Sequence, residues 1–251
     1  MRYAALDWIL NRMRPLWLSM VLPLVQHQRK KNAPVQVFGL TLQTQFEVHH
    51  PGYFFSSRWL AKYVLPRSLN NKRFLDMGTG SGLVGLVAAR NGARVLAVDH
   101  HSLAVQLAEI NARQNNLAAR MQCRISDLFS SIAPEEQFDV MAFDLPPGSV
   151  SGGSSSCLLT RFLVGARKHL HPGGSIIMIL AARRQAWEYC RHFRRFGFQP
   201  VAHDLKRTIW DTYYLFELQY APRQNPATAP AGSNTLAEIS MALQPSIDDG
   251  L

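Results

Sequence analysis

The middle of the chain alternates between short apolar runs and longer segments in which apolar residues recur every three to four positions. A short run bounded by turn residues is typical of a buried strand, whereas the longer spacing is typical of an amphipathic helix. The patterns predict strands over 73–77, 94–99, 121–126, 138–143 and 175–180, and helices over 82–91, 102–116, 158–169 and 184–196. Strands that alternate with helices of this length indicate an α/β fold with a doubly wound, mostly parallel sheet.

The ends of this pattern predict elements of a different kind. Two last strands, over 198–203 and 212–219, have no helix between them and should form an antiparallel hairpin at one edge of the sheet. Upstream, partial alternation over 35–49 around Gly39 predicts another hairpin, and the spacing over 55–65 predicts a helix.

Single residues suggest how two of the helices begin, end and pack. Ser102 is a candidate N-cap, and Gly197 is a typical stop signal for the helix before it. In that helix, four residues are expected to face the sheet: Trp187, Cys190, Phe193 and Phe196.

Composition divides the chain into three parts. With 47% hydrophobic and 18% charged residues, most of the chain is expected to be globular. Residues 1–34 are interpreted as a basic, helical N-terminal extension, and 35–221 as the folded domain. Residues 222–251 contain prolines and small residues without any aromatic, and are expected to form a disordered tail.

Charge and cysteine content restrict the partners and the compartment. The formal net charge of +10 is concentrated near residues 1–35 and 183–207, so two basic patches are expected rather than a uniformly basic surface. The cysteines Cys123, Cys157 and Cys190 form no CxxC pair, which argues against a disulfide framework or a metal site. The apolar stretch at 15–25 is too short to span a bilayer, and a cytoplasmic location is expected.

A glycine-rich loop follows the strand at 73–77 and opens the next helix. It reads Asp76-Met77-Gly78-Thr79-Gly80-Ser81-Gly82, and glycines there let the backbone turn sharply and approach a ligand. Asp99 ends the next strand, where a carboxylate accepts hydrogen bonds from ribose hydroxyls. Asp127 follows the third strand and can accept a hydrogen bond from an adenine amine. Open α/β sheets bind ligands at such strand ends, so these groups are expected to share one crevice.

Together these motifs resemble the class I S-adenosyl-L-methionine-dependent methyltransferases, with their Rossmann-like fold, and in particular the small-domain branch that includes protein-glutamine and ribosomal-RNA enzymes. The resemblance covers roughly residues 35–220. It rests on 75–82, Val98-Asp99, 108–111 with Asn116-Leu117, 126–129, and Phe138-Asp139 leading to Pro146-Pro147. It implies S-adenosyl-L-methionine as cofactor, with Asp76 and Gly78–Gly80 at the methionine moiety, Asp99 at the ribose and Asp127 at the adenine. The expected cofactor-binding set is Asp76, Gly78, Thr79, Gly80, Gly82, Asp99, Asp127 and Leu128.

The reacting site is expected at the end of the fourth strand, in Asp144-Leu145-Pro146-Pro147-Gly148. The relatives carry an Asn- or Asp-Pro-Pro-aromatic element there, whose polar side chain holds the nitrogen to be methylated and whose ring stacks on the target. The resemblance therefore implies catalytic roles for Asp144, Pro146 and Pro147. The chain departs from the pattern because neither alignment of the prolines supplies the ring. The Gly- and Ser-rich stretch 150–156 is either a loop over the pocket or a linker.

Several functions stay open at this point. N-methylation of a protein or RNA is favoured, and the alternatives are small-molecule O- or N-methylation and a non-catalytic nucleic-acid- or membrane-binding protein with a degenerate methyltransferase fold. Gly80–Gly85 also matches GxGxxG, but a nicotinamide dinucleotide would leave Asp76 unexplained. Residues 1–31 are interpreted as a lid, a partner-docking helix or a peripheral membrane contact. A helical stripe of arginines is either a phosphate contact or a solvated face: Arg184, Arg191 and Arg195.

Overall fold

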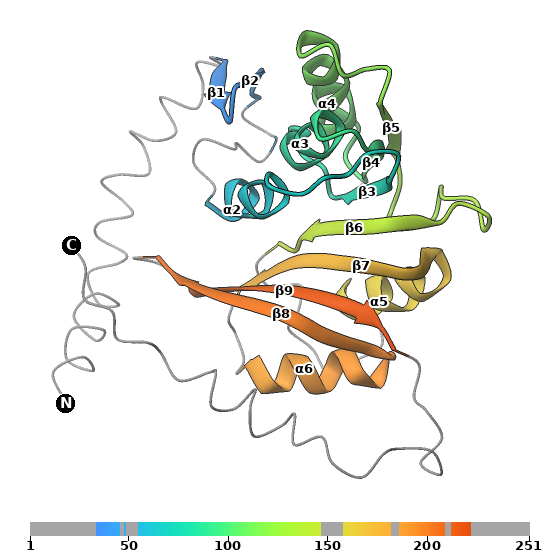
Figure 1. Cartoon of the computed structure of the whole chain (residues 1–251). Coiled ribbons are helices and arrows are strands. Elements are labelled where there is room, and N and C mark those ends of the chain that lie inside the picture. The colour runs from blue at the N-terminus through green and yellow to red at the C-terminus, as the bar shows by residue number, and fades with distance from the viewer. Residues whose placement is uncertain are drawn as a thin grey trace, which may run out of the picture. The chain divides into compact units, whose positions relative to one another are not determined.

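The computed structural model describes residues 34–45, 48, 55–146, 158–181, 186–208 and 212–221 (Figure 1). The first compact unit of the chain ends at Tyr220. Almost all of the predicted N-terminal extension, the whole predicted tail and the stretch 150–156 lie outside the described residues. The three-part division of the chain therefore stays a prediction.

A seven-stranded sheet forms the centre of the described structure, in the order β5-β4-β3-β6-β7-β9-β8 (Figure 1). Strands β5 to β7 in that order run parallel, whereas β9 is antiparallel to both of its neighbours. The strands are β3 (Arg73–Met77), β4 (Arg94–Asp99), β5 (Met121–Ile125), β6 (Phe138–Asp144), β7 (Leu170–Ala181), β8 (Phe198–Arg207) and β9 (Thr212–Tyr220). The predicted mostly parallel sheet with an antiparallel C-terminal hairpin is confirmed.

Helices cover both faces of the sheet, with α2, α3 and α4 on one face and α5 and α6 on the other (Figure 1). Their bounds are α2 (Phe55–Val64), α3 (Leu83–Arg90), α4 (Ser102–Gln114), α5 (Leu158–His169) and α6 (Ala186–Arg195). One core packs Trp59, Leu86 and Ala142 together between α2, α3 and the sheet. On the opposite face, Phe193 of α6 packs against Phe216 of β9 with ring centres 5.2 Å apart. The doubly wound α/β fold is therefore confirmed.

The topology determines where a ligand can bind. Strand β3 is paired with β4 on one side and with β6 on the other, so the chain leaves the centre of the sheet in opposite directions. Loops that follow such neighbouring strands diverge and open a crevice at the carboxyl ends of the strands.

A short hairpin precedes the sheet and packs on α4. Strands β1 (Val35–Val37) and β2 (Leu40–Leu42) pair antiparallel, and both turn residues have positive φ, 51° for Phe38 and 74° for Gly39. Positive φ at both central residues matches the twist of a tight hairpin, and glycine adopts it without strain. The predicted hairpin is thus confirmed, although its strands end at Leu42.

Two local predictions are wrong. The N-cap of α4 is His101 rather than Ser102, and no side chain caps this helix end. Trp187 does not face the sheet, because its side chain is 54% exposed and the buried face of α6 consists of Ala186, Tyr189, Cys190 and Phe193. Trp187 follows Ala186 by one position, about 100° round the helix, and so points away from the face that Ala186 buries.

Two strands are clearly longer than predicted, since β7 begins at Leu170 rather than Ser175 and β8 extends to Arg207 rather than His203. Of the predicted arginine stripe, Arg184 lies outside the described residues, while Arg191 and Arg195 are exposed. The Arg191 guanidinium carbon lies 5.0 Å from the centre of the Trp187 ring. Phosphate contact by this stripe stays a prediction.

Candidate active site

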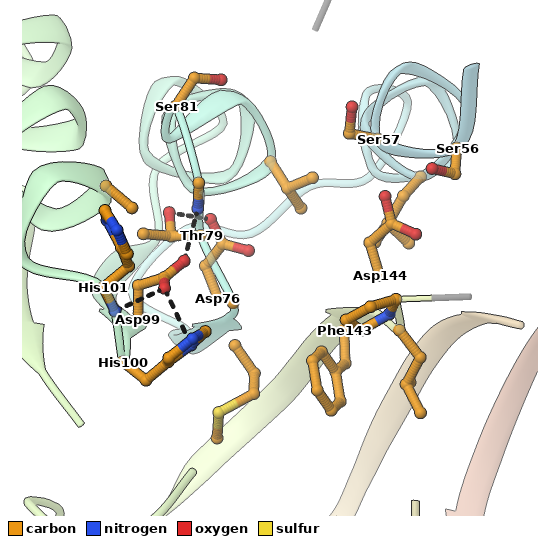
Figure 2. Close-up of a pocket in the computed structure, with 18 of the residues that line it drawn as sticks. Ser56, Ser57, Asp76, Thr79, Ser81, Asp99, His100, His101, Phe143 and Asp144 are labelled. Atoms are coloured by element: carbon orange, nitrogen blue, oxygen red, sulfur yellow. Dashed lines mark hydrogen bonds and ion pairs between the residues drawn. The ribbon is translucent and has the colours of Figure 1, made fainter. Parts of the chain in front are cut away.

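A cavity of about 520 Å³ opens at the carboxyl ends of β3, β4, β5 and β6 (Figure 2). Its lining includes the side chains predicted at four strand ends: Asp76, Asp99, Asp127 and Asp144. A volume of this size suits a small-molecule site. The structure therefore brings the predicted aspartates together in one pocket.

The glycine loop forms one wall of the pocket. Gly78 and Gly80 line it with φ of 68° and 54°, a region that glycine adopts without the strain of other residues. A Cβ on Gly78 would lie 3.2 Å from the ring of Phe143, so the backbone and that ring approach each other closely. Gly82 is not among the lining residues; a Cβ there would lie 3.2 Å from the Cβ of Ala108 on α4. Gly82 thus allows α3 and α4 to pack closely.

Asp76 is buried below this loop and fixes its shape. Its Oδ2 accepts hydrogen bonds from the Thr79 hydroxyl at 2.6 Å and from the Gly85 amide at 2.9 Å. Burial raises the pKa of Asp76 to about 6, although both hydrogen bonds oppose this rise. Asp76 thus connects the end of β3, the loop and the first turn of α3.

Asp99 lies beside the loop at the end of β4 (Figure 2). Its Oδ2 accepts a hydrogen bond from the Gly80 amide at 3.1 Å, and its Oδ1 accepts one from the His101 amide at 3.0 Å. The His100 ring nitrogen lies 3.3 Å from Oδ1. A carboxylate oxygen accepts more than one hydrogen bond, so both oxygens keep acceptor capacity on the pocket side.

Asp127 and Leu128 follow β5 at the rim of the pocket. Leu128 has a positive φ of 52° and a buried side chain, and both residues line the cavity. The exposed Asp127 carboxylate pairs through Oδ2 with Arg161 of α5 at 2.7 Å. No local pattern indicated Arg161, because it lies on a helix 34 residues further along the chain.

Asp144 ends β6 on the opposite side of the pocket from Asp99, and its carboxyl group points toward Ser56 of α2 (Figure 2). The side chain keeps some accessible surface but is enclosed by protein atoms. This enclosure raises the pKa of Asp144 to about 7, and the nearby Asp76 charge adds to the rise. A hydrogen bond with the Ser56 hydroxyl acts in the opposite direction. Asp144 therefore changes between charged and neutral forms near neutral pH.

The remaining predicted residues lie near Asp144 or outside the described residues. Pro146 lines the pocket, and Pro147 lies outside the described residues. The structure adds aromatic residues that the sequence did not identify, since Phe143 and Tyr213 both line the cavity. Ser56 was also missed, because nothing in the local pattern of α2 indicates a partner at the end of β6.

Comparison with known proteins identifies the family of the chain. The family model of the methyltransferase small domain matches residues 51–197, so the chain belongs to this family. The ribosomal protein L11 methyltransferase of Rhizobium etli is 28% identical over 211 residues, covering 81% of this chain and 67% of that protein. The ribosomal RNA large subunit methyltransferase G of Streptomyces coelicolor is 28% identical over 171 residues, covering 64% of this chain and 44% of that protein.

A solved structure supports the fold. The tRNA (uracil-54, C5)-methyltransferase of Pyrococcus abyssi, in complex with S-adenosyl-L-homocysteine, matches with a TM-score of 0.56 and 16% identity. The match covers 74% of this chain and 44% of that chain. The family match defines the class: the protein is an S-adenosyl-L-methionine-dependent methyltransferase. Within the described residues, no helix is both long and apolar enough to cross a membrane.

Proposed function

We propose that the pocket binds S-adenosyl-L-methionine between β3, β4 and β5, and that it presents an acceptor nitrogen of a protein or RNA substrate to Asp144 on β6. The observation that carries this proposal is the single cavity lined by the carboxylates of Asp76, Asp99, Asp127 and Asp144. The cofactor end and the acceptor end are thus continuous, as a direct transfer between two bound partners requires.

The residues at the cofactor end fit the chemistry of the cofactor. Asp99 retains acceptor capacity for the ribose hydroxyls, and Asp127 has its Oδ1 available for the adenine amine. Gly78 and Gly80 leave room for the methionine moiety, and the Asp76 carboxyl group below them favours its positive charges. When bound, the cofactor supplies an electrophilic methyl group on a positively charged sulfur.

Asp144 acts on the acceptor. Its ionised carboxylate accepts a hydrogen bond from the acceptor N–H, which aims the nitrogen lone pair toward the cofactor end of the pocket. Ser56 favours the ionised form by its hydrogen bond and limits the rotation of the carboxyl group. Because positioning dominates a direct transfer, this orientation is the main contribution of Asp144.

Two kinds of substrate follow from the relatives. One relative is named for a ribosomal protein and another for ribosomal RNA, so both macromolecules are candidates for this chain. Peripheral membrane contact by residues 1–31 receives no support from the described structure, since those residues lie outside it.

The experiment that tests this function follows the methyl group. The protein is incubated with a cell extract and cofactor labelled in its methyl group, and the products are digested with nuclease or protease. We expect label in one macromolecular fraction with the wild-type chain and a large loss with Asp144→Ala. S-adenosylhomocysteine binding without any transfer of label contradicts the enzyme assignment for this pocket.

A further inference from the structure

Positive charge gathers outside the acceptor end of the pocket, on the exposed face of α2. Phe55, Arg58 and Lys62 are exposed and lie three and four positions apart, so they share one side of this helix. The helix contains no acidic residue, and its buried side is the one that carries Ser56 and Leu60 into the pocket lining. The cations therefore lie on the same helix that supplies part of the acceptor site.

Lys206 of β8 extends this surface toward the pocket mouth. Its ammonium nitrogen lies 5.6 Å from the centre of the Phe55 ring and 5.2 Å from that of Trp59. In the sheet Lys206 is paired with Tyr213, which lines the pocket. We call Arg58, Lys62 and Lys206 the cationic strip. It reaches from α2 to β8, which is paired with the strand that carries Tyr213.

Among the described residues, no ion pair neutralises the charges of the cationic strip. The side chains of Arg58 and Lys62 make no hydrogen bond or ion pair with any other described residue, in contrast to Arg124, which pairs with Glu136 at 2.9 Å. Asp204, the acidic residue of β8, accepts a hydrogen bond from the Leu205 amide. A strip of unneutralised cations beside a substrate pocket attracts a polyanion.

Inside the pocket the sign of the charge is reversed. Its described lining contains Asp76, Asp99, Asp127 and Asp144 and no lysine or arginine. The preferred substrate is therefore anionic outside the pocket, while the group that enters the pocket donates N–H hydrogen bonds. RNA has this distribution, with phosphates along its backbone and amine or imide N–H groups on its bases.

The rings next to the strip favour RNA over an acidic protein. Phe55 is 37% exposed, and its ring centre lies 6.2 Å from that of Tyr213 at the pocket. Cations interleaved with exposed aromatic rings are typical of surfaces that bind single-stranded nucleic acid, because bases stack on the rings while the cations hold phosphates. Carboxylates of a peptide need only the cations.

We propose that the cationic strip docks a single-stranded segment of RNA, with Phe55 stacking on a base beside the one presented to Asp144. The identity of the strip as a substrate-docking surface rests on the proposed function. RNA binding itself needs neither the cofactor nor methyl transfer.

The test measures binding of a fluorescein-labelled, mixed-sequence, 12-nucleotide single-stranded RNA by anisotropy, without cofactor. Arg58→Glu/Lys62→Glu is compared with Arg94→Glu/Lys168→Glu, which makes the same change in charge at the amino ends of the strands. The side chains of Arg94 and Lys168 are also exposed and make no hydrogen bond or ion pair among the described residues. We expect the strip variant to bind about tenfold more weakly, and the slope of log affinity against log salt to fall by about 1.4. The control should match the wild type.

Two further measurements separate RNA from other partners and from failure of the site. Phe55→Leu should weaken RNA binding about fivefold without a change in salt slope, since it removes a ring and no charge. Calorimetry with S-adenosylhomocysteine on the same variants should give wild-type affinity, which reports the cofactor site independently of RNA. Equal RNA affinity of the two charge variants overturns the proposal. So does a 12-residue polyglutamate peptide that binds the wild type as tightly as the RNA and loses affinity in the strip variant.

Discussion

The two ends of the pocket are constructed differently. At the cofactor end, Asp76, Gly78, Gly80 and Asp99 come from one strand–loop–helix–strand unit, and its two carboxylates accept hydrogen bonds from backbone amides of the same unit or next to it. At the acceptor end, Asp144 meets a serine from α2, and the tyrosine of β9 completes the lining. Those elements are distant in sequence and are brought together by the sheet and by packing on it.

The difference shows which parts of a site local motifs can reveal. A loop whose conformation depends on glycines and on nearby carboxylates has a sequence signature, because the interacting groups are close along the chain. An acceptor site assembled from three separate elements has no such signature. Binding at the first kind of site should depend on the backbone of the loop and on the side chains that support it. The second kind of site should depend on charge and protonation.

The largest effect should come from Asn111, which supports the cofactor end from α4. This buried side chain donates to the carbonyls of Ser81 at 2.8 Å and Gln43 at 3.1 Å, and accepts from the Gln43 amide at 2.7 Å. Asn111→Ala leaves these buried groups unpaired and should lower the free energy of unfolding by about 3 kcal/mol. Chemical denaturation followed by circular dichroism measures this loss.

Asn115→Ala is the matched control for that change. The Asn115 amide donates to the carbonyls of Thr41 and Asn111 at 2.8 Å each and accepts from the Thr41 amide at 2.9 Å, and it has no hydrogen bond to the glycine loop. It is less buried, so the loss should be about 1 kcal/mol, with unchanged affinity for S-adenosylhomocysteine. Equal losses from the two variants would mean that Asn111 supports only the hairpin.

A smaller effect is expected from Gly78→Ala compared with Gly173→Ala. Both glycines have positive φ, 68° and 81°, but a Cβ at Gly173 has nothing within 4 Å whereas one at Gly78 faces the Phe143 ring. Each change should lower stability by about 1 kcal/mol through backbone strain. Only Gly78→Ala should also weaken S-adenosylhomocysteine binding in calorimetry. Wild-type affinity in that variant would show that the conformation of the loop at Gly78 does not contribute to cofactor binding.

Much of the fold and the cofactor end could be predicted from the sequence. The strand bounds at 73–77 and 94–99 and the helix at 158–169 agree with the structure, because apolar periodicity and flanking glycines act locally. Ser56, Arg161 and Tyr213 could not be predicted. Their positions at the pocket depend on packing between elements that only the tertiary structure brings together.

Errors at single residues have a similar origin. The position of Trp187 opposite the arginine stripe predicts burial, but the direction in which α6 packs is set by Ala186, Tyr189 and Phe193. Side-chain type gives the probability of burial, whereas the orientation of a helix depends on all its contacts at once.

The smallest effect concerns the protonation of Asp144. Its pKa is raised to about 7 in the folded chain, while the ordinary value is 3.8. Between these values the folded chain holds a proton that the unfolded chain has lost, so the stability of the wild type relative to Asp144→Asn should fall as pH rises. Urea denaturation of both chains from pH 4 to pH 8 measures this difference. Ser56→Ala should extend the pH range of this fall in stability to higher pH, because the hydrogen bond that it removes lowers the pKa of Asp144.

If the stability of the wild type and that of Asp144→Asn changed in parallel over that pH range, the raised pKa of Asp144 would be contradicted. In the double variant Ser56→Ala/Asp144→Asn, removal of the serine should no longer change the pH dependence. This control separates an effect on Asp144 from a general effect on α2.

The central claim is that one pocket has a cofactor end and a separate acceptor end. Its most direct test is the affinity of the Asp99→Ala and Asp144→Ala variants for S-adenosylhomocysteine, measured by calorimetry. Asp99→Ala should weaken binding by about 1–3 kcal/mol, because hydrogen bonds to a charged acceptor are lost. Asp144→Ala should leave the affinity as in the wild type, since its carboxyl group belongs to the acceptor end. Unchanged binding with Asp99→Ala, or a larger loss with Asp144→Ala, would contradict the division of the pocket.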